Sequence, residues 1–360
     1  MNALSIVFIG LSITSSWGNG HATNYRGLMA ALGRRGHRVL FLERDVPWYA
    51  EHRDLRHPPG GTTELCGSVA ELRARFAADV AAADLVVVGS YVPDGVAVAD
   101  WVLATATGVK AFYDIDTPVT LASVVNGDCA YLTAELIPLF DLYLSFTGGP
   151  TLDLLQQRYG APHAAAFHCL VDPEAYQPID SPLRWDLGYL GTYGADRQPA
   201  LERLLLEPAR QLPDLRFVVA GPQYPDDIVW PANVERIEHL APRDHPAFYA
   251  AQRMTLNLTR ADMVRAGWSP SVRLFEAAAC AVPVLSDRWS GLDSFFEPAR
   301  EIFLADDSAD VIATLTSLDV DTRVSVGRAA RRRVLAAHTA EHRAIELEGH
   351  VRRMRLKESA

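Results

Sequence analysis

The sequence has little of what marks several common classes of protein. Its four cysteines show no C-x-x-C spacing, which favours reduced thiols over a disulfide framework. No apolar run approaches the roughly 20 residues that a membrane-spanning helix needs. Acidic residues outnumber basic ones and the net charge is −10, whereas a nucleic-acid-binding face usually makes a domain basic. We therefore expect a cytoplasmic protein with no nucleic-acid partner and no transmembrane segment.

The apolar start of the chain, LSIVFIGLSI, is not typical of a secretory signal peptide. It has no positively charged region before it, and it breaks into polar SSWGNGH rather than a small-residue cleavage site. A first β-strand explains it better.

Strand-like runs then alternate with helical patterns almost from end to end. In the first half the runs are continuous rather than alternating in polarity, and each is followed by a helix, which indicates parallel strands covered on both faces. The predicted strands of this half are 5–11, 38–43, 84–90, 109–116 and 142–146.

The pattern restarts after the proline-rich stretch 171–185. Further strands are predicted at 186–191, 216–221, 234–240, 254–259 and 283–287. A chain of 360 residues with 49% hydrophobic residues suits two such domains. We predict an α/β protein with an N-terminal Rossmann-like domain over 1–175 and a second over 176–336. Both are expected to face a central cleft, and a helix over 337–360 is expected to pack back on the first.

The loop after the first predicted strand is the first candidate site. Gly18 and Gly20 allow a tight turn around Asn19, and they place His21 near the start of the next helix. A histidine has the intrinsic pKa to accept a proton from an acceptor hydroxyl, so His21 is the candidate base. The alternative is a histidine that only caps the helix, because the spacing does not match G-x-G-x-x-G and no acidic ribose partner is evident.

The stretch 267–287 is the second candidate site. Ser269 is predicted to cap a helix that has Pro270 at its first position, which leaves free N–H groups for a diphosphate. Arg273 lies in the first turn and adds a charge-assisted contact. Glu276, one turn on, is expected on the cleft side of the helix and outside the core, where it can accept hydrogen bonds from ribose hydroxyls. The alternative is a well-capped amphipathic helix with a surface Arg–Glu pair.

Polar loops after the other strands of the second half form a third group. By the strand-end rule they can line a nucleotide site, although each alone is only a surface loop. The residues expected to bind the donor are Tyr193, Arg197, Gly221, Leu240, Arg260, Ser269, Ser271, Arg273 and Glu276.

Asp114 and Asp116 form a D-x-D string that can hold a divalent ion. Such a string is common by chance and a turn follows at once, so both residues are expected to line the acceptor side of the cleft. The histidines show no HExxH pattern and no zinc spacing. We therefore expect no catalytic metal and no cofactor.

Taken together, these residues resemble a known family. A glycine-rich first loop that ends in histidine and a donor-site helix that contains F-E-A resemble the GT-B glycosyltransferases. More narrowly, YDIDTPVT, SFTGGPTLDLL, VDPEAYQP, RLFEAAAC and HTAEHRA resemble the CgeB-like (spore maturation protein) glycosyltransferases, over nearly the whole chain.

The resemblance implies a metal-independent hexosyltransferase. The donor, a UDP- or dTDP-sugar, would bind mainly the C-terminal domain, and a small-molecule, glycan or protein acceptor the N-terminal one. Glu276 matches the ribose-binding glutamate of related families, and His21 matches the loop that meets both substrates. Families with an E-x7-E motif have a second glutamate where this chain has Trp268, which leaves the retaining or inverting outcome open.

Other functions are compatible with the same sequence. An epimerase or a phosphorylase-type enzyme would share the fold. A Rossmann-like oxidoreductase is disfavoured by the missing glycine fingerprint. A coat-associated protein that binds nucleotide sugars without turnover is a further alternative.

Overall fold

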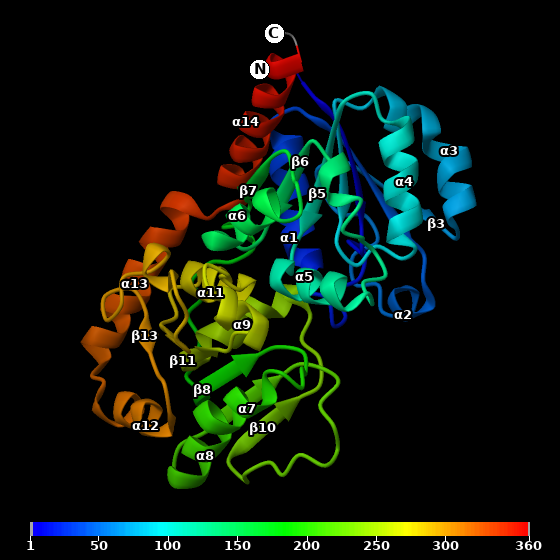
Figure 1. Ribbon diagram of the computed structural model, residues 1–360. Coiled ribbons are helices and arrows are strands. Elements are labelled where there is room, and N and C mark those ends of the chain that lie inside the picture. Colours follow the sequence, from blue (N-terminus) through cyan, green and yellow to red (C-terminus); the bar gives the residue numbers. More distant parts are fainter. Residues whose placement is uncertain (1–2, 359–360) are drawn as a thin grey trace. The chain divides into compact units, whose positions relative to one another are not determined.

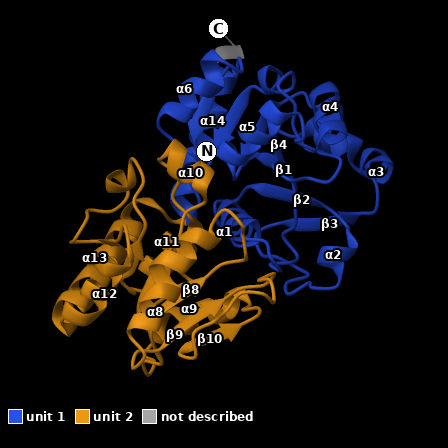
Figure 2. Cartoon of the chain, turned by 60° about the horizontal axis from the view of Figure 1, so that its bottom comes forward, with its two compact units in different colours: residues 1–170, 340–360 blue, residues 171–339 orange. Residues whose placement is uncertain are grey.

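The computed structural model describes residues 3–358. It divides the chain into two compact units, coloured separately in Figure 2. Unit 1 is Met1–Leu170 together with Ala340–Ala360, and unit 2 is Val171–Thr339. The sequence predicts the two domain boundaries after residues 175 and 336, whereas the units divide after Leu170 and Thr339. Within the described residues, no helix is long and apolar enough to cross a membrane.

Unit 1 is built on a parallel seven-stranded sheet in the order β3-β2-β1-β4-β5-β6-β7. The strands are β1 (Ser5–Gly10), β2 (Arg38–Arg44), β3 (Thr62–Cys66), β4 (Leu85–Gly89), β5 (Val109–Asp114), β6 (Leu142–Ser145) and β7 (Ala164–Ala166). Strand order reverses between β1 and β4, so loops at their carboxyl ends flank the crevice where ligands bind in open α/β sheets.

The helices of unit 1 cover both faces of this sheet (Figure 1). They are α1 (His21–Arg34), α2 (Pro47–Ala50), α3 (Val69–Ala82), α4 (Gly95–Thr105), α5 (Thr117–Asn126), α6 (Pro150–Gln157) and α14 (Ala340–Glu358), with a short 3₁₀ turn at Ile137–Leu139. The apolar residues of α1 recur at helical spacing and are buried, among them Tyr25, Leu28, Met29 and Leu32.

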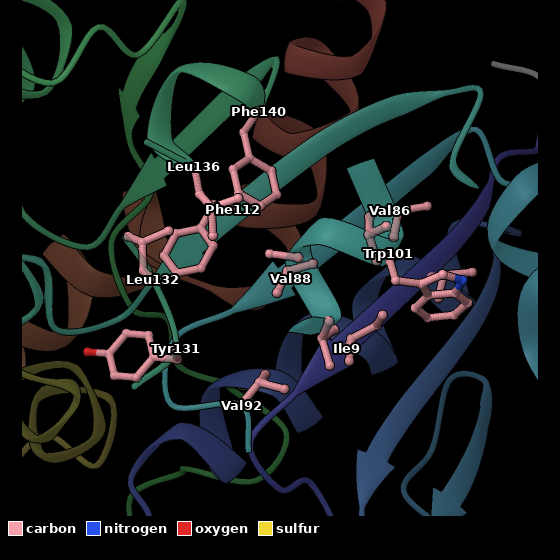
Figure 3. Close-up of a cluster of buried hydrophobic side chains, with 14 of the residues drawn as sticks. Ile9, Val86, Val88, Val92, Trp101, Phe112, Tyr131, Leu132, Leu136 and Phe140 are labelled. Carbon is pink, nitrogen blue, oxygen red and sulfur yellow. The ribbon is translucent and has the colours of Figure 1, made fainter. Parts of the chain in front are cut away.

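Figure 3 shows part of the apolar core of unit 1. Ile9, Val86 and Val88 come from neighbouring strands, and Phe112 meets Phe140 with ring centroids 5.5 Å apart. These side chains fix the strands, and therefore the loops that leave their carboxyl ends.

The last helix, α14, packs on α1 inside unit 1 (Figure 1). The amide of Leu4 donates to Nδ1 of His37 at 3.0 Å, so Nε2 carries the proton and donates to Glu348 at 2.8 Å. Arg35 adds a two-pronged contact to the same carboxylate. The Arg35 hydrogen bond, reinforced by His37, lowers the pKa of Glu348 to about 2. A buried ion cluster thus joins the end of the chain to its first helix.

Unit 2 repeats the plan with a parallel six-stranded sheet in the order β10-β9-β8-β11-β12-β13. The strands are β8 (Trp185–Leu190), β9 (Phe217–Ala220), β10 (Val234–Ile237), β11 (Gln252–Asn257), β12 (Val284–Ser286) and β13 (Phe303–Leu304). Here the order reverses between β8 and β11, which marks the corresponding crevice.

The helices of unit 2 pack around a core that includes Leu187, Leu204, Phe217 and Leu256. They are α7 (Gln198–Leu201), a π-helical turn (Glu202–Leu206), α8 (Glu207–Gln211), α9 (His245–Ala250), α10 (Ala261–Ala266), α11 (Val272–Ala279), α12 (Ser308–Ser317) and α13 (Val320–Ala337), with short 3₁₀ turns at Pro242–Asp244 and Leu292–Ser294. The predicted α/β fold class is confirmed.

Candidate functional site

The loop between β1 and α1 places His21 at the carboxyl edge of the unit 1 sheet. Gly18 has φ +59°, a left-handed conformation that favours glycine. Asn19 is buried, and its amide donates to the carbonyls of Ser12 and Ser15 while its oxygen accepts from the His21 N–H. Gly20 occupies the N-cap position, so His21 is the first residue of the helix. The histidine side chain does not cap the helix.

Two residues from neighbouring strand ends meet the His21 ring. Nε2 lies 3.9 Å from Oδ2 of Asp116, which follows β5. Tyr91, which follows β4, packs its ring edge-on against the imidazole at 5.4 Å and donates its hydroxyl to Asp116 at 3.0 Å. Tyr91 has φ +63°, a conformation that large side chains rarely adopt and that often marks a functional site. The structure therefore brings together two predicted residues, His21 and Asp116.

The second ring nitrogen of His21, Nδ1, is buried and has no hydrogen-bond partner among residues 3–358. An unsatisfied buried nitrogen is costly unless a ligand supplies its partner. The His21 side chain is 12% exposed. His21 thus combines a carboxylate on one side with an unused nitrogen on the other, an arrangement suited to a general base.

Asp114 does not line the edge of the sheet as expected, because its side chain is turned into the core. It is fully buried, and its oxygens accept hydrogen bonds from Tyr143 at 2.6 Å and Thr120 at 2.7 Å. Burial raises the pKa of Asp114 to about 6. The hydroxyls of Tyr143 and Thr120 hold Asp114 in the core, while Asp116 lies beyond the end of β5.

In unit 2 the centre of the polar edge is Arg273, which is only 8% exposed. Its Nε donates to the carbonyl of Leu190 at the end of β8, and its Nη1 donates to Oδ1 of Asn257 at the end of β11, at 2.9 Å. The guanidinium also lies 4.6 Å from the ring centroid of Tyr189. Arg273 therefore spans the two strands between which the sheet order reverses.

All the acceptors of Arg273 are neutral. Within the part of the chain that the structure describes, no carboxylate forms an ion pair with it. Its charge acts on the buried carboxyl of Asp287, whose pKa burial raises overall although Arg273 lowers it. A buried guanidinium without a carboxylate in direct contact is unfavourable, and an anionic ligand would relieve part of the cost.

The start of α11 differs from the sequence prediction. The helix begins at Val272, and the N-cap residue is Ser271 rather than Ser269. The hydroxyl of Ser271 donates to Asn257 at 2.6 Å, and the hydroxyl of Ser269 donates to the carbonyl of Gly267 at 2.9 Å. The polar Asn257 competes for the capping hydroxyl, so the first N–H groups of α11 receive no side-chain cap.

Glu276 is also placed differently, because it is 3% exposed and belongs to the core of unit 2. It accepts hydrogen bonds from the hydroxyls of Tyr176 at 2.8 Å and Tyr249 at 3.1 Å, and Nδ1 of His245 lies 3.6 Å from Oε2. Burial raises the pKa of Glu276, but these contacts more than offset it, and the pKa lies below its usual value. The expectation that Glu276 lies outside the core differs from the structure, because α11 is buried on every face from Arg273 to Ala279. The alternative of a surface Arg–Glu pair differs for the same reason.

The remaining predicted donor residues follow the strands at the same edge of unit 2. Arg197 and Tyr193 lie after β8, where Nη2 of Arg197 donates to the carbonyl of Thr192 at 2.6 Å and the Tyr193 ring meets Tyr224 at 5.6 Å. Gly221, after β9, has φ +143°, and a Cβ there would lie 2.0 Å from the carbonyl of Gly191. A small hollow at this end of β8 is lined by Tyr189, Thr192, Gly194, Arg197, Gln198, Leu201 and Tyr224.

Leu240 and Arg260 have partners of their own. The carbonyl of Leu240 accepts from Nε2 of His245 at 3.3 Å, which connects it to the Glu276 cluster. Arg260 pairs with Asp196 at 3.2 Å.

Sequence reasoning missed several residues of these clusters. Asn257 is a polar residue inside the apolar run MTLNLT, and this contrast in polarity could have indicated a functional residue. Tyr176, Tyr249 and His245 gave no pattern, because they meet Glu276 only through tertiary folding. No group of three or more metal-ligating side chains occurs in the described residues.

Comparison with known proteins bears on the fold. Residues 197–349 match the model of a family described as glycosyl transferase-like. The sucrose-phosphate synthase of Thermosynechococcus elongatus has a similar structure, with a TM-score of 0.74 at 15% identity over 99% of each chain. The chain has the GT-B fold.

Two further GT-B structures have similar scores. HepE of Anabaena, determined in complex with UDP and glucose, matches with a TM-score of 0.69 at 13% identity, over 97% of this chain and 99% of its own. An alpha-glucosyltransferase in complex with UDP-glucose and DNA matches with a TM-score of 0.70 at 12% identity, over 96% and 98%. No curated protein matches the sequence.

Proposed function

We propose that the protein transfers a sugar from a nucleotide-diphosphate sugar to an acceptor hydroxyl. The observation that carries this proposal is Arg273, a buried guanidinium with only neutral partners at the point where the unit 2 sheet reverses its order. A diphosphate bound there would supply the missing negative charge. The uncapped N–H groups of α11, next to Ser271, would share it.

In this proposal Arg273 also assists the chemistry. When the bond between the anomeric carbon and the diphosphate oxygen breaks, negative charge grows on the departing nucleoside diphosphate. A fixed guanidinium stabilises that charge more than it stabilises the ground state. No metal is needed for this step, because cationic and N–H groups perform it.

His21 is the proposed general base. The acceptor oxygen attacks the anomeric carbon while its proton passes to a ring nitrogen of His21. Asp116, 3.9 Å from Nε2, stabilises the imidazolium that results. The ionised Glu276 is proposed to bind the ribose, and Tyr193, Arg197, Gly221, Leu240 and Arg260 to surround the rest of the nucleotide.

The proposal also covers the donor, the enzyme group and the cellular location. The donor is proposed to be a UDP- or dTDP-sugar, and the enzyme a hexosyltransferase of the CgeB-like group acting in the cytoplasm. The GT-B neighbours with bound UDP or UDP-glucose support the donor class. Trp268 stands where an E-x7-E motif has its first glutamate, so the stereochemical outcome must be measured.

A thermal-shift panel of UDP, dTDP, GDP and ADP tests the donor site, because a ligand that binds only the folded state raises the apparent melting temperature. We expect UDP or dTDP to give the largest shift. Donor hydrolysis with the matching nucleotide sugars then tests catalysis, and turnover should persist in excess EDTA. No shift with any nucleotide would refute the proposal, and binding without turnover would favour a binding protein. Loss of turnover in EDTA that manganese restores would contradict the metal-free mechanism.

A further inference from the structure

An aromatic cluster of unit 1 has no part in the roles given above. It consists of Trp17, from the loop that precedes α1, with Trp48 and His52, from and just after α2. The rings of Trp17 and His52 stack at 4.3 Å with an interplanar angle of 19°, and Trp48 lies 6.2 Å from His52. Trp48 is nevertheless 49% exposed. Trp48 lies beside the stacked pair and still exposes half of its surface to solvent. Such a tryptophan is a candidate contact for a ligand.

The cluster is held rigidly against the loop that carries His21. The hydroxyl of Ser15 donates to the carbonyl of His52 at 2.8 Å, and the amide of Ser16 donates to Asp54 at 2.9 Å. Arg26, on α1, makes a two-pronged contact to the same Asp54 at 2.8 and 2.9 Å. The two segments therefore form one surface, and its aromatic rings cost little entropy to order on binding.

The groups around the rings suit a ligand rich in hydroxyls. Nδ1 of His52 donates to the carbonyl of Trp48 at 3.1 Å, so Nε2 of the neutral ring is an acceptor. The ion pair of Arg53 with Asp45 lies on the same segment. Paired guanidinium and carboxylate groups offer donors and acceptors side by side, which matches a hydroxyl that does both.

We propose that this aromatic cluster binds the acceptor, and that the acceptor is a carbohydrate. A pyranose ring has one apolar face of C–H groups, which packs on the electron-rich face of an aromatic ring, and a rim of hydroxyls for the polar neighbours. The net charge of −10 disfavours DNA as the occupant. Trp17 lies four residues before His21 in the chain, so one loop carries both a ring of the cluster and the proposed base. This inference rests on the proposed function for its catalytic meaning, but not for the binding itself.

The test is saturation-transfer NMR of the full chain with three neutral disaccharides, maltose, cellobiose and lactose. Sorbitol serves as the comparator, because it has similar hydroxyls but no ring with an apolar face. We expect saturation on the C–H protons of at least one disaccharide and little on sorbitol. In calorimetry, Trp48→Ala should raise the dissociation constant of that disaccharide roughly 2- to 13-fold, the range for losing one aromatic stack. Trp48→Phe should restore most of the affinity.

The control is Leu139→Ala, which removes another exposed apolar side chain of unit 1, 56% exposed, outside the cluster. It should leave disaccharide binding unchanged. Three outcomes overturn the inference. The first is equal saturation of sorbitol and the disaccharide, and the second is a disaccharide affinity that does not change in Trp48→Ala. The third is a short DNA duplex that binds through Trp48 while the disaccharides do not bind.

UDP binding measured on the same samples separates the two proposals. Protein that binds UDP but no disaccharide refutes the carbohydrate acceptor alone. Protein that binds a disaccharide through Trp48 but no nucleotide refutes the proposed function and supports the sugar-binding surface.

Discussion

Units 1 and 2 have the same sheet order around their switch points but differ in the buried charged groups at the strand ends. In unit 1, two buried carboxylates are held by neutral donors. Glu43 accepts from Ser12, Ile13 and Thr14, and Asp114 accepts from Tyr143 and Thr120. In unit 2, Asp287 is a buried carboxylate of the same kind, which accepts from Thr259. Unit 2 differs in also holding the buried guanidinium of Arg273, whose hydrogen-bond acceptors are neutral.

This difference indicates how one architecture can serve two substrates. A carboxylate surrounded by hydroxyl and amide donors is already satisfied, and it fixes the loops on which His21 and Trp17 lie. A guanidinium that receives only carbonyl and amide oxygens has no counter-charge in direct contact. We expect unit 1 to act on hydroxyl groups and protons and unit 2 to hold an anion. Four substitutions test this division.

The largest expected effect is that of His21→Ala on turnover. If His21 is the base, kcat should fall by roughly 10²–10⁴-fold. Donor affinity should stay nearly constant, because the anion site belongs to unit 2. Steady-state kinetics with a melting curve measures both. The matched control is His57→Ala, an exposed histidine of the same unit.

Other outcomes for His21 are equally informative. A raised acceptor KM with normal kcat at saturation would make His21 a positioning residue. A lower melting temperature with intact kinetics would assign it a structural role in the loop. Near-wild-type kcat in a folded protein excludes it as the base.

Arg273→Ala should weaken the binding of the preferred nucleoside diphosphate by roughly 10- to 100-fold, the loss expected for hydrogen bonds to a charged group. Arg273→Lys should recover only part of this, because lysine cannot bridge two strand ends and an anion at once. Titration calorimetry measures the affinity. Arg265→Ala, which removes a side chain that is 70% exposed, should have no effect. Unchanged affinity in Arg273→Ala would remove the main contrast between the units.

Glu276→Ala tests a buried carboxylate of unit 2 that accepts from two tyrosine hydroxyls and lies close to His245. The structure changes the expectation for this substitution, because loss of the carboxylate leaves two tyrosine hydroxyls and His245 without their partner. We expect the free energy of unfolding to fall by about 2–4 kcal/mol, in addition to weaker nucleotide binding. Denaturant unfolding measures it, with exposed Glu207→Ala as the control. Wild-type stability would show that the buried cluster contributes little.

Asp114→Asn should change how stability depends on pH. The folded protein keeps this proton up to a pKa of about 6, whereas the reference carboxyl loses it near 3.8. The folded state therefore binds more protons in that window, and raising the pH across it should lower the free energy of unfolding. The contribution is on the order of 2 kcal/mol. Unfolding at pH 4 and pH 7 should show a smaller decrease in Asp114→Asn than in the wild type, and identical decreases would contradict the raised pKa.

Much of the fold could be predicted from the sequence, because buried parallel strands are continuous apolar runs. The ten predicted strands are all present, with ends within a few residues. Three strands were missed. β3 has a polar sequence and lies at the sheet edge, β7 is three alanines with weak strand preference, and β13 has only two residues.

The candidate sites were less predictable, because strand ends are known from sequence but side-chain directions beyond them are not. The loop position of His21 followed from its glycines. By contrast, the inward turn of Asp114 depends on Tyr143 and Thr120. The burial of Glu276 depends on Tyr176, which lies 100 residues away in the chain. Such contacts between distant residues leave no local pattern.

The ion cluster that joins Glu348 to Arg35 and His37 has a consequence for how the protein is made. Unit 2 is a continuous insertion, so all of its residues leave the ribosome before α14 does. The first helix of unit 1 therefore lacks its partner helix until unit 2 and then α14 have been synthesised. During that interval the face of α1 that will meet α14 is uncovered, and the nascent N-terminal half is the part that most needs protection from aggregation.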